Sequence, residues 1–155
     1  MTAVAVLAAA RARGWRIATA ESCTGGLVAA ALTEVPGSSD VVDRGFVTYS
    51  NAAKREMLGV RSDTLDAHGA VSEEVAREMA EGALAHSQAD LAVATTGIAG
   101  PGGSEFKPEG RVCFALALKT GNTRCETVEF GAIGRHNVRE GAVTKALSLL
   151  LDAAR

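Results

Sequence analysis

The stretch Arg111–Phe130, RVCFALALKTGNTRCETVEF, decides the fold. Two strand-like runs, 111–119 and 123–130, flank Gly121-Asn122, a dipeptide typical of two-residue hairpin turns. The two strands of a hairpin are antiparallel to each other. The sheet that contains this hairpin therefore cannot be wholly parallel.

The rest of the chain alternates between strands and helices. Strands are predicted near 15–19, 46–49 and 91–95, and helices near 2–13, 27–35, 52–58, up to His68, after Ser72 and near 137–153. Such alternation is typical of helices on both faces of a sheet. Together with the hairpin, it predicts an α/β fold: one domain, 1–155, a three-layer α/β/α sandwich around a mixed sheet of about five strands, one of them antiparallel. The almost wholly apolar segment 27–35 is predicted to be a buried helix.

Composition excludes several classes of protein. The 155 residues are 47% hydrophobic and 22% charged, a globular balance unlike that of a disordered chain. A net charge of −2 does not favour a nucleic-acid groove, and no apolar run is long enough to span a membrane. The apolar run Ala3–Ala10 precedes Arg11 and Arg13, the wrong charge order for an export signal, so we expect a cytoplasmic protein.

The three cysteines do not form an even disulfide framework. With a two-residue turn, Leu118 lies opposite Cys125 and Cys113 lies opposite Phe130. Because side chains alternate between faces of a strand, Cys113 and Cys125 are expected on opposite faces and not in a disulfide.

The first candidate site is Glu21–Gly26, ESCTGG, between a predicted strand and a predicted helix. A hydroxyl at Ser22 would lie beside unpaired backbone N–H groups and the positive end of a helix dipole, where an oxyanion or a phosphate is stabilised. The alternative is a simple helix cap, since Ser and Thr are favoured there for the same reason. Cys23 is a second possible nucleophile.

The second candidate site is Gly45–Lys54, GFVTYSNAAK, in which Asn51 is expected to cap a helix. A serine nucleophile needs a base, and a neutral lysine serves if burial or nearby positive charge lowers its pKa. Lys54 is therefore a candidate base, and a solvated surface lysine is the alternative.

Two further segments are candidates for ligand contacts. The glycine-rich loop 97–110 matches no standard phosphate loop, and it is either a ligand loop or a plain surface loop. Arg135 and Arg139 are four residues apart, so both could face one phosphate, or they could form a solvated helix face. The three histidines are scattered and the cysteines form no CxxC, so no metal site is expected.

Taken together, these motifs closely resemble the CinA C-terminal-domain family, known as nicotinamide-nucleotide amidases (PncC) or competence/damage-inducible proteins. The motifs that carry the resemblance, in order and spacing, are AESCTGG (20–26), GFVTYSN (45–51), Lys54, GAVS (69–72) and TGIAGP (96–101). The resemblance extends from about residue 7 to residue 151.

The resemblance implies hydrolysis of the carboxamide of nicotinamide mononucleotide to nicotinate mononucleotide and ammonia, without a metal or cofactor. It implies Ser22 as nucleophile, Lys54 as general base and Tyr49 as a supporting hydroxyl. The residues expected to contact this small nucleotide substrate are Thr24, Gly25, Gly26, Thr96, Gly97, Gly100, Arg135 and Arg139. Backbone N–H groups near 24–26 or at Gly97 would hold the oxyanion, and Arg135 or Arg139 the phosphate.

The resemblance also implies a homo-oligomer and the three-layer fold. Some relatives carry a further N-terminal domain, which this chain is expected to lack. Two other functions stay open at this stage: a non-catalytic protein-interaction module linked to competence or DNA damage, and an amidase that acts on another small carboxamide.

Overall fold

The computed structural model describes residues 2–104 and 106–155. In chain order the elements are α1 (Thr2–Arg13), β1 (Ile17–Glu21), α2 (Leu27–Thr33), the short 3-10 helix η1 (Ser38–Asp40), β2 (Val42–Val47), α3 (Asn51–Leu58), α4 (Ser62–His68), α5 (Glu73–Ala85), β3 (Leu91–Gly97), β4 (Arg111–Leu118), β5 (Thr123–Glu129) and α6 (Arg135–Ala154).

The five strands form one mixed sheet in the order β2-β1-β3-β4-β5. β1 is parallel to β2 and to β3, whereas β4 is antiparallel to both β3 and β5. β4 therefore runs against the other four strands. The predicted mixed sheet with one antiparallel strand is confirmed.

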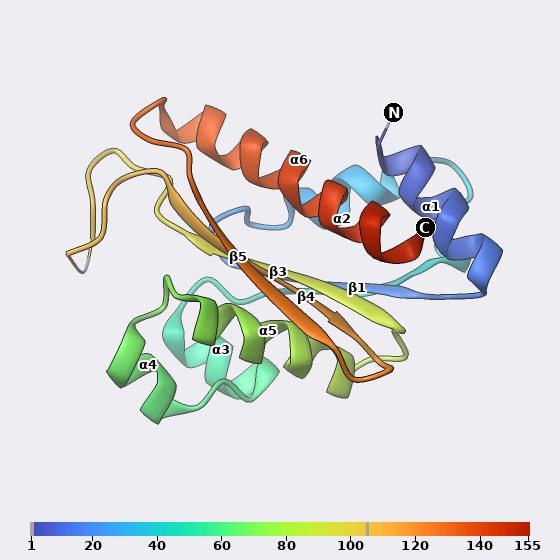
Figure 1. Ribbon diagram of the computed structural model, residues 1–155, viewed down its shortest axis with the longest axis horizontal. Coiled ribbons are helices and arrows are strands. Elements are labelled where there is room, and N and C mark those ends of the chain that lie inside the picture. Colours follow the sequence, from blue (N-terminus) through green and yellow to red (C-terminus); the bar gives the residue numbers. More distant parts are fainter. Residues whose placement is uncertain (1, 105) are drawn as a thin grey trace.

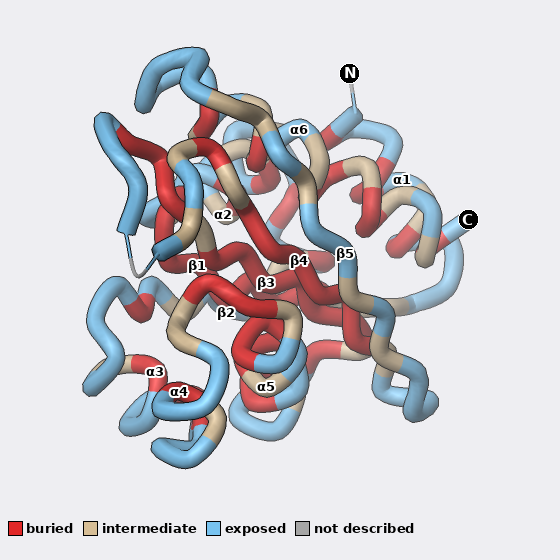
Figure 2. Tube along the Cα trace, turned by 60° about the vertical axis from the view of Figure 1, so that its left-hand side comes forward, coloured by how far each residue is buried: buried red, intermediate tan, exposed pale blue. Residues whose placement is uncertain are grey.

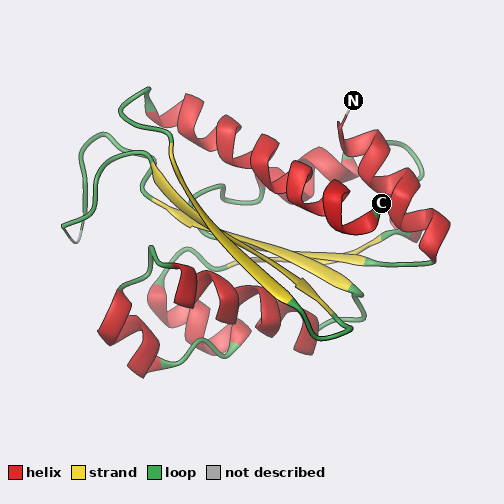
Figure 3. Ribbon diagram, viewed as in Figure 1, coloured by secondary structure: helices red, strands yellow, loops and turns green. Residues whose placement is uncertain are grey.

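The sheet lies between two layers of helices (Figures 1 and 3). α1, α2 and α6 cover one face, and α3, α4 and α5 cover the other. Figure 2 shows the buried residues concentrated on the central strands, with exposed residues on the outer sides of the helices. Leu7, Phe114 and Leu150 belong to the apolar core on the α6 side, and Met79 to the core on the α5 side.

The hairpin between β4 and β5 has a longer turn than the sequence predicts. The Leu118 N–H donates to the Asn122 carbonyl (2.9 Å), and the Gly121 N–H donates to the Leu118 carbonyl (2.9 Å). The loop is thus the three residues 119–121. Gly121, at φ 114°, supplies the positive φ that closes such a loop, so it is the last loop residue and not the first of two.

This longer turn overturns the predicted register of the two cysteines. Cys125 lies opposite Ala115, and Cys113 lies opposite Thr127. Both cysteines therefore point to the same face of the sheet, against the core on the α5 side. Neither is in a disulfide.

Two local predictions are also wrong. The cap of α3 is Ser50, whose Oγ accepts from the Ala53 N–H (3.0 Å), and Asn51 is the first helical residue. The helix predicted to be buried, α2, is buried at Val28 and Leu32 but leaves Leu27 38% exposed. α2 lies near the edge of the sheet, where its outward side meets no other layer (Figure 1).

Gly82 sets the distance between α5 and α3. A Cβ at Gly82 would lie 2.0 Å from the Leu58 carbonyl oxygen, at the end of α3. We expect Gly82→Ala to lower the free energy of unfolding by about 1–3 kcal/mol through overpacking, although alanine favours helices. Urea denaturation measures this, and an unchanged or raised stability would contradict such close packing.

Candidate active site

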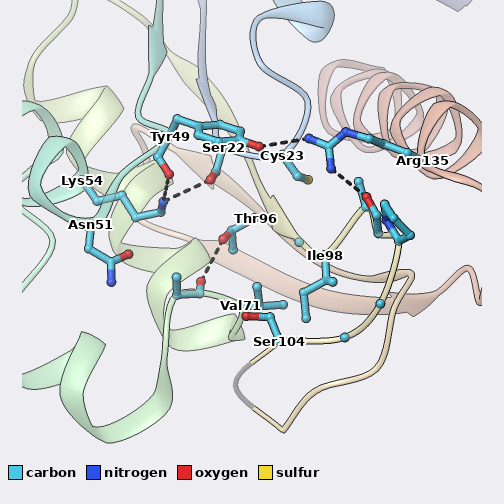
Figure 4. Close-up of a pocket in the computed structure, with 17 residues that line it drawn as sticks. Ser22, Cys23, Tyr49, Asn51, Lys54, Val71, Thr96, Ile98, Ser104 and Arg135 are labelled. Carbon is cyan, nitrogen blue, oxygen red and sulfur yellow. Dashed lines mark hydrogen bonds between the residues drawn. The ribbon is translucent and has the colours of Figure 1, made fainter.

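The carboxyl ends of β1, β2 and β3 meet at one edge of the sheet. The chain leaves β1 for β2 on one side and reaches β3 on the other, so β1 marks the point where ligands bind in open α/β sheets. A pocket of about 330 Å³ opens there. Its lining includes Ser22, Cys23, Tyr49, Lys54, Thr96 and Arg135 (Figure 4).

Ser22 and Lys54 meet in the inner part of this pocket. Lys54 Nζ lies 3.0 Å from Ser22 Oγ. Ser22 is 8% exposed and Lys54 only 1% exposed. Ser22 follows β1 directly, and its N–H donates to the Thr95 carbonyl of β3 (2.9 Å), which ties the start of the turn to the sheet.

Lys54 is buried because α3 turns its inner face towards the sheet. The Ser50 cap starts α3 immediately after the chain leaves β2, which places Lys54 one turn into the helix. Its Nζ also lies 2.9 Å from the Thr48 carbonyl oxygen and 3.5 Å from that of Tyr49. The sequence left a solvated lysine open, and the structure excludes that alternative.

Cys23 is no competitor to Ser22. Burial raises the pKa of the Cys23 thiol to about 12. Because the thiolate is the reactive form, the thiol is inert near neutral pH.

The turn after Ser22 is held by a carboxylate that the sequence analysis did not single out. Glu21, 1% exposed, accepts from the N–H groups of Gly26 (3.2 Å), Val28 (2.9 Å) and Ala29 (3.0 Å) and from Thr24 Oγ1 (2.6 Å). The N-cap residue of α2 is Gly26, and the Glu21 carboxylate, not the hydroxyl of Ser22 or Thr24, accepts from the first N–H groups of the helix. Thr24, Gly25 and Gly26 do not line the pocket.

The two arginines are directed to different places. Arg135 Nη1 donates to the Gly100 carbonyl (2.8 Å), and its Nη2 donates to the Tyr49 hydroxyl (3.0 Å). This hydrogen bond holds the Tyr49 ring across the mouth of the pocket (Figure 4). Arg139 instead donates to the carbonyls of Cys23 (3.1 Å) and Thr24 (3.5 Å), and it does not line the pocket.

The remaining wall comes from β3 and the glycine-rich loop. Thr96, Gly97 and Gly100 line the pocket, and Thr96 Oγ1 donates to the Ala70 carbonyl (2.8 Å). Glu109 Oε1 accepts from the Gly102 N–H (2.8 Å) and braces this loop. The loop is therefore a wall of the pocket and not a plain surface loop.

The described part of the chain lacks two other features. Among residues 2–104 and 106–155, no group of three or more His, Cys, Asp or Glu side chains gathers where a metal ion could be held. No helix in these residues is long and apolar enough to cross a membrane.

Residues 1–154 of the chain match the family model of the CinA C-terminal domain. The chain belongs to this family. The family predicted from the sequence motifs is thereby confirmed.

Several family members are similar along most of this chain. The nicotinamide-nucleotide amidohydrolase PncC of Enterobacter agglomerans is 51% identical over 149 residues, 96% of this chain and 90% of its own length. PncC of Escherichia coli K12 is 53% identical over 143 residues. A CinA-like protein of Chloroherpeton thalassium is 62% identical over 108 residues, but these are 26% of its own length. The chain thus spans most of the PncC proteins and a minor part of this longer relative.

Solved structures in the same family have the same fold. The competence/damage-inducible protein from Agrobacterium tumefaciens has a TM-score of 0.96 at 50% identity and covers 99% of this chain and 94% of its own. That from Klebsiella pneumoniae has a TM-score of 0.93 at 44% identity.

Glu21 and Asn51 fall within the two candidate segments of the sequence analysis, which gave neither of them a role at the site. Asn51 lines the pocket beside Lys54, and the sequence analysis considered it only as a cap. An acidic residue at the end of an apolar strand, before a glycine-rich helix start, is a usable signal for Glu21 because helix N-termini favour carboxylates.

Proposed function

We propose that this domain hydrolyses the carboxamide of nicotinamide mononucleotide to nicotinate mononucleotide and ammonia, with Ser22 as nucleophile and Lys54 as general base. The observation that carries the proposal is the 3.0 Å separation of Ser22 Oγ and Lys54 Nζ inside a pocket. A nucleophile within hydrogen-bond reach of its base is the arrangement that acyl transfer requires. The PncC relatives bear the name of this activity.

The contacts of Lys54 suit a base. A neutral amine has two hydrogens and one lone pair. Nζ can donate hydrogens to the carbonyls of Thr48 and Tyr49, and Ser22 Oγ, 3.0 Å away, is close enough to pass its proton to the lone pair of the neutral amine.

The proposed reaction has two stages, acylation of Ser22 and hydrolysis of the acyl-serine. Ser22 Oγ forms a bond to the amide carbon as its proton moves to Lys54, and the carbonyl oxygen becomes an oxyanion. As the oxyanion collapses, the C–N bond breaks and Lys54 returns the proton to the departing ammonia. Water, deprotonated by Lys54, attacks the acyl-serine, and the proton returns to Ser22 Oγ as nicotinate mononucleotide leaves.

Arg135 is the better anchor for the phosphate of the substrate. It lines the pocket, whereas Arg139 does not. A guanidinium can bind a phosphate through two parallel hydrogen bonds. With the carboxamide at Ser22, the nucleotide would extend towards Arg135.

The proposal is tested by incubating the protein with nicotinamide mononucleotide and measuring ammonia and nicotinate mononucleotide. Nicotinamide, nicotinamide riboside and glutamine serve as comparison carboxamides. We expect the highest kcat/KM for the mononucleotide, because only this substrate offers Arg135 a phosphate. If only another carboxamide is hydrolysed, nicotinamide mononucleotide is not the substrate. If none of the four compounds releases ammonia, the result favours a protein-interaction module.

A further inference from the structure

The turn that follows Ser22 is hydrogen-bonded on one side by a carboxylate and on the other by a guanidinium. On one side the Glu21 carboxylate accepts hydrogen bonds from the N–H groups of Gly26, Val28 and Ala29. On the other side Arg139, one helical turn after Arg135 on α6, donates from Nε to the Cys23 carbonyl and from Nη2 to the Thr24 carbonyl. The turn is thus fixed both at its donors and at its acceptors.

Arg139 is packed tightly against this turn. A Cβ added at Gly25, at φ 59°, would lie 3.2 Å from Arg139 Nη2. The glycine lets the guanidinium approach the backbone. Arg139 is itself only partly exposed, and its contacts join α6 to a turn more than a hundred residues earlier in the chain.

Two further backbone N–H groups are paired within the turn itself. The Gly25 N–H donates to the Ser22 carbonyl (3.0 Å), and the Leu27 N–H donates to that of Thr24 (3.0 Å). By contrast, the N–H groups of Cys23 and Thr24 donate to no oxygen of residues 2–104 and 106–155. They directly follow the proposed nucleophile, but only Cys23 lines the pocket, whereas Thr24 is fully buried and does not.

The hydrogen bonds of the turn orient these two N–H groups. In a trans peptide the C=O and the following N–H point in opposite directions. The Cys23 carbonyl points at Arg139, so the Thr24 N–H points away from it. The Ser22 carbonyl points at the Gly25 N–H, so the Cys23 N–H points the other way.

We infer that Arg139 is a positioning residue: by holding the turn after Ser22 at the Cys23 and Thr24 carbonyls, it keeps the Cys23 N–H in place as an oxyanion donor for the substrate of Ser22. The inference rests on the proposed function and deepens it. Arg139 acts through the backbone and not by touching substrate. The Thr24 carbonyl that Arg139 contacts shares a peptide group with the Gly25 N–H, which donates to the Ser22 carbonyl. The Ser22 carbonyl in turn shares a peptide group with the Cys23 N–H, so the contact with Arg139 is passed along the turn to this donor.

The expected loss of kcat in an Arg139 variant follows from the contribution of oxyanion donors to catalysis. Loss of one such donor lowers kcat by roughly 10²–10³-fold. Arg139→Gln leaves the Cys23 N–H present but loosely held, so we expect kcat to fall by about 10–100-fold. KM should change little, because the oxyanion exists only in the transition state. Arg139→Lys, which can reach one of the two carbonyls, should retain more activity than the glutamine variant.

The experiment compares wild type with four variants: Arg139→Gln, Arg139→Lys, Arg135→Gln and Arg124→Gln. In the last of these an exposed arginine of β5 is changed in the same way. The substrates are nicotinamide mononucleotide and the phosphate-free riboside. If Arg139 positions the turn, its variants lose kcat on both substrates by a similar factor. Arg135→Gln, by contrast, should chiefly raise KM for the mononucleotide. A loss by Arg139→Gln that appears as KM on the phosphorylated substrate alone would make Arg139 a phosphate ligand and overturn the inference.

A second measurement does not depend on the substrate. A fluorophosphonate forms a bond between phosphorus and Ser22 Oγ as fluoride leaves, and its phosphoryl oxygen needs the same donors. Mass spectrometry should show labelling of Arg139→Gln about tenfold or more slower than wild type. Equal labelling rates, with thermal unfolding as in wild type, would overturn the inference. Wild type that labels at Ser22 but releases no ammonia would contradict only the proposed substrate, and the labelling rates would still decide the role of Arg139.

Discussion

Ser22→Ala is expected to lower ammonia release from nicotinamide mononucleotide by on the order of 10⁴-fold or more, while the protein stays folded. The alanine removes the only atom that is proposed to bond to the amide carbon. Cys23, next in sequence, cannot take over, because burial raises the pKa of its thiol to about 12. Thermal unfolding should change little, since Lys54 Nζ keeps the carbonyls of Thr48 and Tyr49 as acceptors.

The chain offers a matched control for this variant. Ser38 is 8% exposed, as Ser22 is, but it lies in η1, before β2 begins and hence at the opposite end of the parallel strands. Ser38→Ala makes the same chemical change at the same depth and should keep wild-type kcat. Activity of Ser22→Ala above about a tenth of wild type would contradict the nucleophile assignment.

Lys54→Ala is expected to lower kcat by roughly 10²–10⁴-fold, the usual worth of a general base. Lys54→Arg should be similarly inactive, because a guanidinium carries a positive charge and cannot accept a proton. The arginine variant therefore separates proton transfer from simple electrostatic support. Small primary amines added to Lys54→Ala should restore part of the activity by occupying the vacated volume.

The pH dependence of the wild type gives an independent check on the same base. Lys54 accepts a proton only as a neutral amine, so kcat/KM should fall as the pH is lowered and the amine becomes protonated. A flat profile from about pH 5 to 9 would argue against a lysine base. Full activity of Lys54→Arg would argue against it as well.

Much of the architecture followed from local patterns. The hairpin 111–130 requires an antiparallel pair, and the alternating segments before it require helices on both faces, so the mixed sheet was predictable. The register of that hairpin was not. The same sequence is compatible with a three-residue loop that ends at Gly121 and with a two-residue turn that starts there. Only the pairing of β4 with β5 distinguishes the two.

The sequence by itself determined the family, the sheet and the residue types available for chemistry, because motifs and periodicities are local properties of the chain. Tertiary structure alone decided which of these residues meet. Lys54 is buried beside Ser22 because α3 packs against the sheet. The Glu21 carboxylate reaches the first N–H groups of α2 because the chain turns back at Gly26. Arg135 and Arg139 lie one helical turn apart, so no local pattern separates them, and only the packing of α6 directs one to the pocket and the other to the backbone of the turn.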